Sequence, residues 1–380
     1  MPGSFRAILL LKNRGNIRYL LVFFIMIFSF LFSATSSLYD EGFESFYNYR
    51  FEEAAHWLQQ SAKNSDSPYI FNMFITYNEI RRCLANAKYE TASRNADSLI
   101  SKFEPDFKTY LKEYPEDVDV RFYYAAMLGG KMRVYLHDMS YFKIMSEGPP
   151  ILLAKTRIDK YTNEYPDIAF GTGSFNYYLS QFAKVRGLTG GLFNTTKENG
   201  INDLWKAYYE GKLVKWEASI VLIYITIYDR VDFNVADELC RKFLDRYPDN
   251  MEVLSLYTEL NYYQKNYKEA KKYYQHLEDL TYGGRLEDNS GYVSKCLYLK
   301  GVEQMVRGNS RKAMRQFRLL LIDNNIEYSW YHAITLKYLG DCAYNLNETD
   351  LARYYYRQTV NTRELIPHVL QARDILNEIK

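Results

Sequence analysis

Apolar side chains recur every three or four residues along most of the chain after residue 37, which places them on one face of an α-helix. The segments IFNMFITYNEIRRCL, ETASRNADSLISKF and DVDVRFYYAAMLGGKMRVYL show this period clearly. No sustained alternation of apolar and polar residues is bounded by hairpin turns, so we predict an all-α fold without significant sheet. Helices in the first half are expected to stop at or near the prolines, which are Pro68, Pro105, Pro115, Pro149, Pro150 and Pro166.

Small residues recur at fixed distances in the C-terminal half. Ala236 and Ala270 lie 34 residues apart (270 − 236 = 34). Further along, a glycine precedes an alanine by twelve residues, and an aromatic residue follows that alanine by four. These triplets are Gly301, Ala313 and Phe317, and Gly340, Ala352 and Tyr356. Two helices cross closely only where both carry small side chains, so the spacing predicts a repeated helical hairpin.

This pattern resembles the tetratricopeptide repeat (TPR), a 34-residue helical hairpin with a small residue at position 8, alanine at 20 and a large apolar residue at 24. The segment YNYRFEEAAHWL fits the same register, because Ala54 at position 20 puts Gly42 at 8 and Leu58 at 24. The resemblance covers at least residues 38–62 and 217–366. It implies a TPR-like α-solenoid of stacked antiparallel helix pairs. The tightest crossings are expected at the Gly301–Ala313 and Gly340–Ala352 pairs.

Four parts are predicted along the chain. Residues 1–36 form a signal peptide or an N-terminal membrane anchor, and residues 37–165 form N-terminal helical repeats. Residues 166–216 contain a glycine-marked helix and a loop insertion, and we expect these glycines to allow a close helix crossing. Residues 217–380 contain four repeats and a capping helix, at 217–250, 251–284, 294–327, 333–366 and 368–379.

The N-terminal segment is basic and then apolar. Four cations precede the uncharged run YLLVFFIMIFSFLFSA, and the first acidic residue is Asp40. This run is short for a bilayer-spanning helix, which needs about 20 residues, and suits the core of a signal peptide. Small residues at 34–36 favour cleavage after Ser36. A retained anchor is the alternative, and either reading predicts an exported protein, periplasmic or associated with the cell envelope.

Composition narrows the classes of function. Lys and Arg number 48 and Asp and Glu 46, for a formal net charge of +2, which gives no electrostatic case for nucleic-acid binding. Tyrosine is unusually frequent, at 38 residues. A tyrosine ring can be buried while its hydroxyl keeps a polar contact, so this supply suits both helix–helix seams and a binding surface.

No motif for catalysis stands out. FGTGSFN begins like a dinucleotide-binding loop, but Asn176 occupies the place of the required third glycine. The five histidines are not paired at metal-ligand spacing, and the cysteines are scattered. We therefore predict no enzymatic activity, no cofactor, no metal and no disulfide among Cys83, Cys240, Cys296 and Cys342.

The central region also resembles a narrower set of proteins, on the strength of Gly190–Gly191 followed by a helix with Gly200, Leu204 and Ala207. Exported bacterial repeat proteins, the eukaryotic inclusion-body-clearance family and, loosely, a repeat component of some periplasmic-binding transporters are similar to it. FNTTKEN departs from the Asp-Arg pair that many of the bacterial proteins have there. The resemblance implies protein–protein interaction in the cell envelope and no chemistry.

We predict a scaffold that binds a protein or peptide partner in a concave groove formed by the first helix of each repeat. The membrane would be contacted only by an uncleaved N-terminal segment. The alternative is a solute- or glycan-binding accessory protein of an envelope transport system, with a pocket near Trp205, Trp216 and the 187–199 loop. The groove candidates combine charge with aromatic rings, and their tyrosines are expected to be exposed. They are Glu252, Ser255, Glu259, Tyr262, Tyr263, Lys295, Tyr298, Lys337, Asp341, Tyr344 and Asn345.

Overall fold

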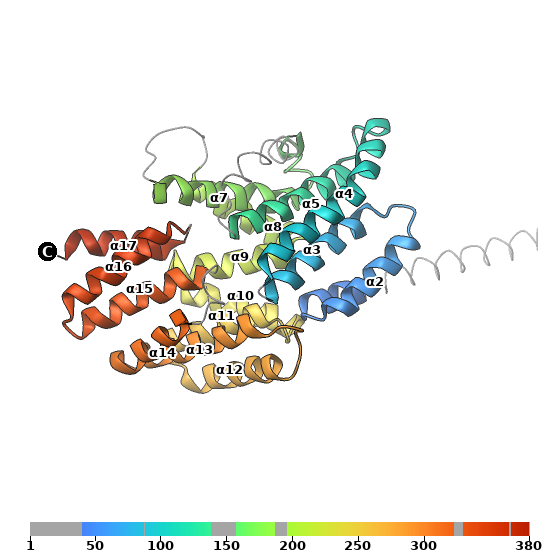
Figure 1. Ribbon diagram of the computed structural model, residues 1–380. Coiled ribbons are helices and arrows are strands. Elements are labelled where there is room, and N and C mark those ends of the chain that lie inside the picture. The colour runs from blue at the N-terminus through green and yellow to red at the C-terminus, as the bar shows by residue number, and fades with distance from the viewer. Residues whose placement is uncertain are drawn as a thin grey trace, which may run out of the picture.

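The computed structural model describes residues 40–86, 88–137, 157–186, 196–322, 330–364 and 366–379. Within these ranges the chain consists of α-helices and their connections, without a strand (Figure 1). The all-α prediction is therefore confirmed for the described part of the chain. The predicted signal peptide and residues 187–195 of the predicted loop lie outside it. No helix in the described ranges is long and apolar enough to cross a membrane.

The helices follow one another as antiparallel neighbours. A helix over 40–47 opens the described chain. The next helices are α2 (Phe51–Lys63), α3 (Tyr69–Ala85), α4 (Tyr89–Glu113), α5 (Val118–His137), α7 (Ile168–Arg186) and α8 (Lys197–Glu210). Four hairpins follow. They pair α9 (Lys215–Tyr228) with α10 (Phe233–Arg246), α11 (Met251–Tyr263) with α12 (Tyr267–Tyr282), α13 (Ser290–Val306) with α14 (Ser310–Ile322), and α15 (Trp330–Asn345) with α16 (Thr349–Thr362). The last helix, α17 (Pro367–Glu378), packs on α15 and α16.

The same turn joins the two helices of five hairpins. In each of these turns the residue two positions before the second helix has a positive φ, which only glycine adopts without steric cost. The hairpin of 40–47 and α2 shares this turn with the four C-terminal hairpins, so the N-terminal pair is built in the same way. The five residues are Tyr49 (φ 62°), Val231 (53°), Lys265 (60°), Gly308 (77°) and Asn347 (61°).

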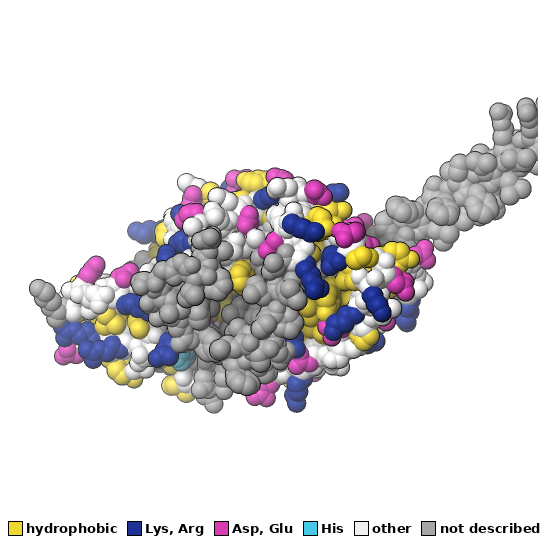
Figure 2. All heavy atoms as spheres, turned by 90° about the horizontal axis from the view of Figure 1, so that it is seen from above, with side chains coloured by type: hydrophobic (Ala, Val, Ile, Leu, Met, Phe, Trp, Pro, Cys, Tyr) yellow, Lys and Arg dark blue, Asp and Glu magenta, His cyan; other side chains and the backbone are white. Residues whose placement is uncertain are grey.

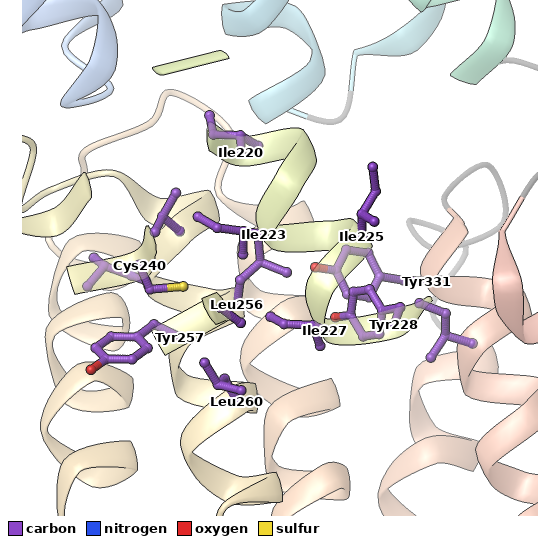
Figure 3. Packing of buried hydrophobic residues seen from close by; sticks show 14 of the residues in the cluster. Ile220, Ile223, Ile225, Ile227, Tyr228, Cys240, Leu256, Tyr257, Leu260 and Tyr331 are labelled. Atoms are coloured by element: carbon purple, nitrogen blue, oxygen red, sulfur yellow. The ribbon is translucent and has the colours of Figure 1, made fainter. Parts of the chain in front are cut away.

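Helix α9 lies at the centre of the array. It packs against α7, α8, α10 and α11. A helix surrounded by others can be apolar on all sides, and α9 carries the run ASIVLIYITIY. Figure 3 shows Ile223 and Ile227 of α9 near Leu256 of α11. These side chains belong to one continuous cluster that runs through most of the described chain.

One proline does not stop its helix. Pro105 lies inside the 25-residue helix α4, so the expectation that helices end at each proline is wrong there. A proline ring removes one backbone hydrogen bond and crowds the carbonyl four residues earlier. Pro105 and Ser101 are both exposed. The carbonyl that loses its partner is therefore on the solvent side of the helix, where water can replace the lost bond.

Helices α7 and α8 cross with their backbones in direct contact at two glycines. A Cβ added to Gly173 would lie 2.7 Å from the carbonyl oxygen of Gly200, and one added to Gly200 would lie 2.7 Å from the backbone nitrogen of Tyr177. Contacts this short with backbone atoms leave no room for a side chain. The prediction that the central glycines allow a close helix crossing is confirmed for Gly173 and Gly200, whereas nothing lies within 4 Å of a Cβ at Gly171, and Gly190–Gly191 lie outside the described residues.

At the two crossings predicted in the C-terminal hairpins, the glycine faces an aromatic ring. A Cβ at Gly340 would lie 2.6 Å from the ring of Tyr356, and one at Gly301 would meet the ring of Phe317. These glycines make room for the aromatic residue at position 24 of the hairpin, and their closest neighbours are not Ala352 and Ala313. The expectation that the tightest crossings are Gly301–Ala313 and Gly340–Ala352 is therefore wrong.

The four cysteines are free and buried, as expected. Burial raises the pKa of the Cys296 thiol to about 11 and those of Cys83 and Cys342 to about 12. A protonated, buried thiol is a poor nucleophile. The cysteines therefore act as small core residues.

Two glycines on one helix give a matched test of the α7–α8 crossing. Gly173→Ala should lower the free energy of unfolding by about 1–3 kcal/mol, because its methyl group would collide with the backbone of α8. Gly171→Ala is the control, since nothing lies within 4 Å of a Cβ there. It should raise stability by up to about 1 kcal/mol through helix propensity. Urea unfolding measures both, and equal effects would contradict the crossing.

Candidate functional site

The groove candidates divide into an interior group and a small exposed group. Tyr298 is 2% exposed and Tyr262 is 4% exposed, whereas Tyr344 is 52% exposed. The expectation of exposed groove tyrosines is therefore wrong for Tyr262 and Tyr298 and confirmed for Tyr344. Ser255 and Glu259 are also buried, Asn345 is exposed, and Glu252, Tyr263, Lys295, Lys337 and Asp341 are intermediate.

Glu259 is the centre of the first interior group, which we name the Glu259 cluster. It is 1% exposed and accepts hydrogen bonds from the hydroxyls of three tyrosines. Tyr228 of α9 and Tyr298 of α13 each donate at 2.7 Å, and Tyr263 of α11 donates to the same carboxylate. Burial raises the pKa of Glu259, and the three hydroxyls oppose this rise because they stabilise its ionised form.

The Glu259 cluster extends to the C-terminal helix. The hydroxyls of Tyr263 and Tyr338 are hydrogen-bonded, and the Tyr338 hydroxyl lies 3.4 Å from Nε2 of His368. Burial lowers the pKa of His368 to about 3, so its ring is neutral at physiological pH. The ring of His368 also packs edge-on against Tyr228, with 5.1 Å between centroids. The first turn of α17 is therefore part of the interior.

A second interior group, the Arg81 bridge, joins both halves of the chain. Arg81 of α3 is 5% exposed. Its Nη1 lies 2.7 Å from Glu217 of α9, and its Nη2 lies 3.0 Å from Glu252 of α11. Tyr224 donates to Glu252 at 2.9 Å, and Tyr49 does so at 3.4 Å. Burial opposes the charge of Arg81, but Glu217 raises its pKa above the ordinary value.

Lys295 lies between the two groups. Its Nζ is 4.7 Å from the ring centroid of Tyr292 and 5.1 Å from that of Tyr331, a cation–π arrangement. Burial lowers the pKa of Lys295, while Glu252 and Glu259 oppose this shift. Figure 3 shows Tyr331 beside Tyr228 of α9, so the same rings border the Glu259 cluster.

Segments from both ends of the chain close the interior. At one end, Asn250 donates to the carbonyl of Tyr47 at 2.7 Å, and the backbone nitrogen of Asp249 donates to Asn48 at 3.0 Å. At the other end, Gln371 of α17 donates to the carbonyl of Tyr228 at 3.4 Å. Around Tyr298 and Glu259, the surface predicted as a groove is thus occupied by other side chains of the protein, and this explains their burial.

Several residues of the interior were not among the sequence-based candidates. Arg81 was detectable in principle, because the helical period places it on the same face of IFNMFITYNEIRRCL as Phe74 and Tyr77. The tyrosines were not, because 38 are present and nothing local separates them. The missed residues are Tyr49, Arg81, Glu217, Tyr224, Tyr228, Tyr292, Tyr331, Tyr338 and His368.

The tryptophans of the alternative hypothesis contact their own neighbours. Trp205 stacks on Tyr209, with 5.5 Å between ring centroids. Trp216 packs edge-on against Phe243 and Tyr247, at 5.4 and 5.3 Å. Residues 187–195 of the 187–199 loop lie outside the described residues. A separate surface depression of about 560 Å³ lies at the α9–α10 turn and Gln264.

The described part of the chain holds no group of three or more His, Cys, Asp or Glu side chains placed to bind a metal ion.

No protein-family model matches the chain, and no curated protein matches its sequence. A tetratricopeptide repeat protein from Parabacteroides merdae is a structural neighbour at 10% identity, over 81% of this chain and 98% of that one, with a TM-score of 0.34. That likeness is too low to carry an argument about function. The hairpins themselves define the architecture. The fold is a TPR-like α-solenoid.

The Arg81 bridge can be tested by removing its cation. Arg81→Met should lower the free energy of unfolding by about 3–5 kcal/mol, because Glu217 and Glu252 would lose their charged partner in the interior. Lys242→Met is the control, since it breaks an exposed ion pair with Glu238. Urea unfolding at neutral pH should show a nearly unchanged midpoint for the control. A similar small effect in both variants would refute the bridge.

The Glu259 cluster predicts a pH-dependent effect. Tyr298→Phe removes one hydroxyl donor to Glu259 and should lower the free energy of unfolding by about 1–3 kcal/mol at about pH 8. Because burial raises the pKa of Glu259, the carboxyl becomes neutral as the pH falls through its folded pKa, and the lost donor then matters less. The effect should shrink at about pH 5.

Tyr354→Phe removes an exposed hydroxyl and serves as the control, with no change expected at either pH. Chemical denaturation at the two pH values provides the measurement. A loss for Tyr298→Phe that is independent of pH would mean that its hydroxyl does not stabilise a carboxylate.

Proposed function

We propose that this protein is a non-enzymatic interaction scaffold, exported to the periplasm or cell envelope, that binds a protein or peptide partner through exposed parts of its hairpin array. The observation that supports the proposal is that the charged groups of the interior are bonded to one another and to tyrosines. Glu252, Glu259 and Arg81, the groups most suited to chemistry or ligand binding, are hydrogen-bonded to other side chains of the chain. Stacked hairpins with such an interior offer an extended outer surface.

The C-terminal hairpin keeps part of the predicted groove accessible. Tyr344 and Asn345 at the end of α15 are exposed. Lys337, two turns before Tyr344, forms an ion pair at 2.8 Å with Asp341, which lies one turn before Tyr344. The Tyr356 hydroxyl donates to Asp341 at 2.9 Å. An exposed aromatic ring beside ordered charges is a common arrangement in protein interfaces. Tyr344 is therefore our first candidate contact residue.

Export is supported by the sequence of residues 1–36, in which cations precede a short apolar run and a small-residue cleavage site. The alternative of a solute- or glycan-binding protein has less support, because Trp216 packs into the core with Phe243 and Tyr247. A scaffold needs neither a closed pocket nor a lining of free aromatic rings.

The proposal can be tested in the native host. Intact mass of the recovered protein should show that residues 1–36 are removed, and chemical crosslinking in envelope extracts should capture a defined partner. Tyr344→Ala should weaken this capture without changing the melting temperature, since an exposed ring contributes little to folding.

Tyr282→Ala is the matched control, because Tyr282 is also exposed, at 61%, but ends α12 away from the C-terminal hairpin. Capture should be unaffected in this variant. A cytosolic protein that retains residues 1–36, or a wild-type protein that crosslinks to no partner, would contradict the proposal.

A further inference from the structure

The second helices of three consecutive hairpins carry equivalent positions on their outer face. Taking the buried alanine of each hairpin as position 20 (Ala270, Ala313 and Ala352), positions 18, 22 and 25 repeat in α12, α14 and α16. All nine residues at these positions are exposed. They are Lys268, Lys272 and Gln275 in α12, Arg311, Arg315 and Arg318 in α14, and Asp350, Tyr354 and Arg357 in α16.

Six of these nine residues are cations and one is an acid, for a net charge of +5 (6 − 1). We name the six cations the basic stripe: Lys268, Lys272, Arg311, Arg315, Arg318 and Arg357. The acid, Asp350, pairs with Arg353 at 3.2 Å, outside the stripe. Since the whole chain has a net charge of only +2, the stripe is a strong local excess of positive charge.

The stripe cations have no ion-pair partner among the described acidic residues. Other exposed cations of the second helices do have one, such as Arg241 with Asp237 and Lys242 with Glu238. Arg318 donates to the hydroxyl of Tyr355 at 3.2 Å, which joins α14 to α16. The stripe therefore passes from α14 to α16 at this contact, α12 repeats the same positions in the preceding hairpin, and the charges of the stripe are available to a partner.

Another face of the molecule carries a mixture of charges. Figure 2 shows lysine and arginine side chains intermingled with acidic ones on the face that is uppermost in Figure 1, where α4, α5 and α7 lie. Helices α12 and α14 lie along the lower edge of Figure 1, away from that face. In α10 the equivalent positions hold Asn234, Glu238 and Arg241, so the excess of cations begins at α12.

We propose that the basic stripe is the docking surface for an acidic segment of a partner protein. This inference rests on the proposed scaffold function and names the surface and the chemistry of its partner. The guanidinium groups of Arg311, Arg315 and Arg318 are suited to bind carboxylates with two parallel hydrogen bonds. Exposed Leu319 (48%) and Tyr354 (54%) provide apolar contact area beside them.

The dimensions favour an extended protein segment. Positions 18 to 25 span seven residues, or about 10 Å along each helix. Helices in contact lie about 10 Å apart, and the Arg318–Tyr355 contact joins α14 to α16, so on these two helices the stripe covers on the order of 10 Å in each direction. An extended chain of about three or four residues has this length. A bilayer fits less well, because interfacial binding needs a broad apolar face, and few apolar side chains accompany these cations.

The probe is a fluorescently labelled peptide of about twelve glutamates, titrated into the full chain at low and at physiological salt. The test variant is Arg311→Glu/Arg315→Glu. The control is Lys102→Glu/Lys112→Glu, which makes the same charge change at two exposed positions of α4. Circular dichroism verifies folding, and Arg311→Gln/Arg315→Gln replaces the test variant if that variant is unfolded.

We expect the dissociation constant of the peptide to rise at least about tenfold in the stripe variant and less than about twofold in the control. Equal weakening in both variants would show a response to net charge alone, and it would overturn the inference. So would a wild-type protein that fails to bind the peptide. The wild-type protein could instead bind phosphatidylglycerol vesicles or duplex DNA more tightly than the peptide and lose this binding in the stripe variant. That result would overturn the inference that the partner is an acidic protein segment.

The failure of this inference is distinguishable from the failure of the scaffold function. If the wild-type chain captures a partner in envelope extracts and the stripe variant captures it equally well, the stripe is not the docking surface. The proposed scaffold function is then unaffected. If the wild-type chain captures none, the scaffold function itself fails.

Discussion

A carboxylate that leaves water must gain other donors, and two glutamates on α11 impose this constraint on the whole fold. Glu252 and Glu259 are seven residues apart, two helical turns, so both point to the same side of α11. Their donors come from α9, α11, α13, the first hairpin turn and α3. One polar side of one helix therefore fixes the relative positions of segments up to 203 residues apart. The tyrosines among these donors serve two purposes, because their rings fill the core and their hydroxyls donate to the carboxylates.

The architecture was predictable because the hairpin pattern is local. The spacing between Gly340, Ala352 and Tyr356 lies within one hairpin, and the structure places Gly340 and Tyr356 in contact. The exposure of the candidate site was not predictable, because it depends on distant partners. Position 5 of the predicted repeat 294–327 is a groove position by register, yet Tyr298 is buried there by Glu259, Tyr331 and Tyr338. A register shows which way a side chain points and leaves open what covers it.

Tolerance to unfavourable residues also depends on three-dimensional context. Pro105 is accommodated in α4 because its side of the helix faces solvent, and Gly173 is required in α7 because α8 crosses at that point. Both residues have low helix propensity. The first could be replaced without disturbing any packing, whereas the second could not. Sequence alone gives the propensity of each residue, and the neighbouring helix decides whether that residue is needed.

A filled interior changes where function can be sought. Residues that pack inside are constrained by folding, so their identity carries little information about partners. The outer positions of α14 are free of that constraint, and there folding would favour a mixture of charges. Arg311 and Arg315 are four residues apart and Arg315 and Arg318 three, and like charges at these spacings destabilise a helix by about 0.2–0.5 kcal/mol per pair. Helix stability therefore disfavours this arrangement, and an acidic binding partner would offset the repulsion when it docks.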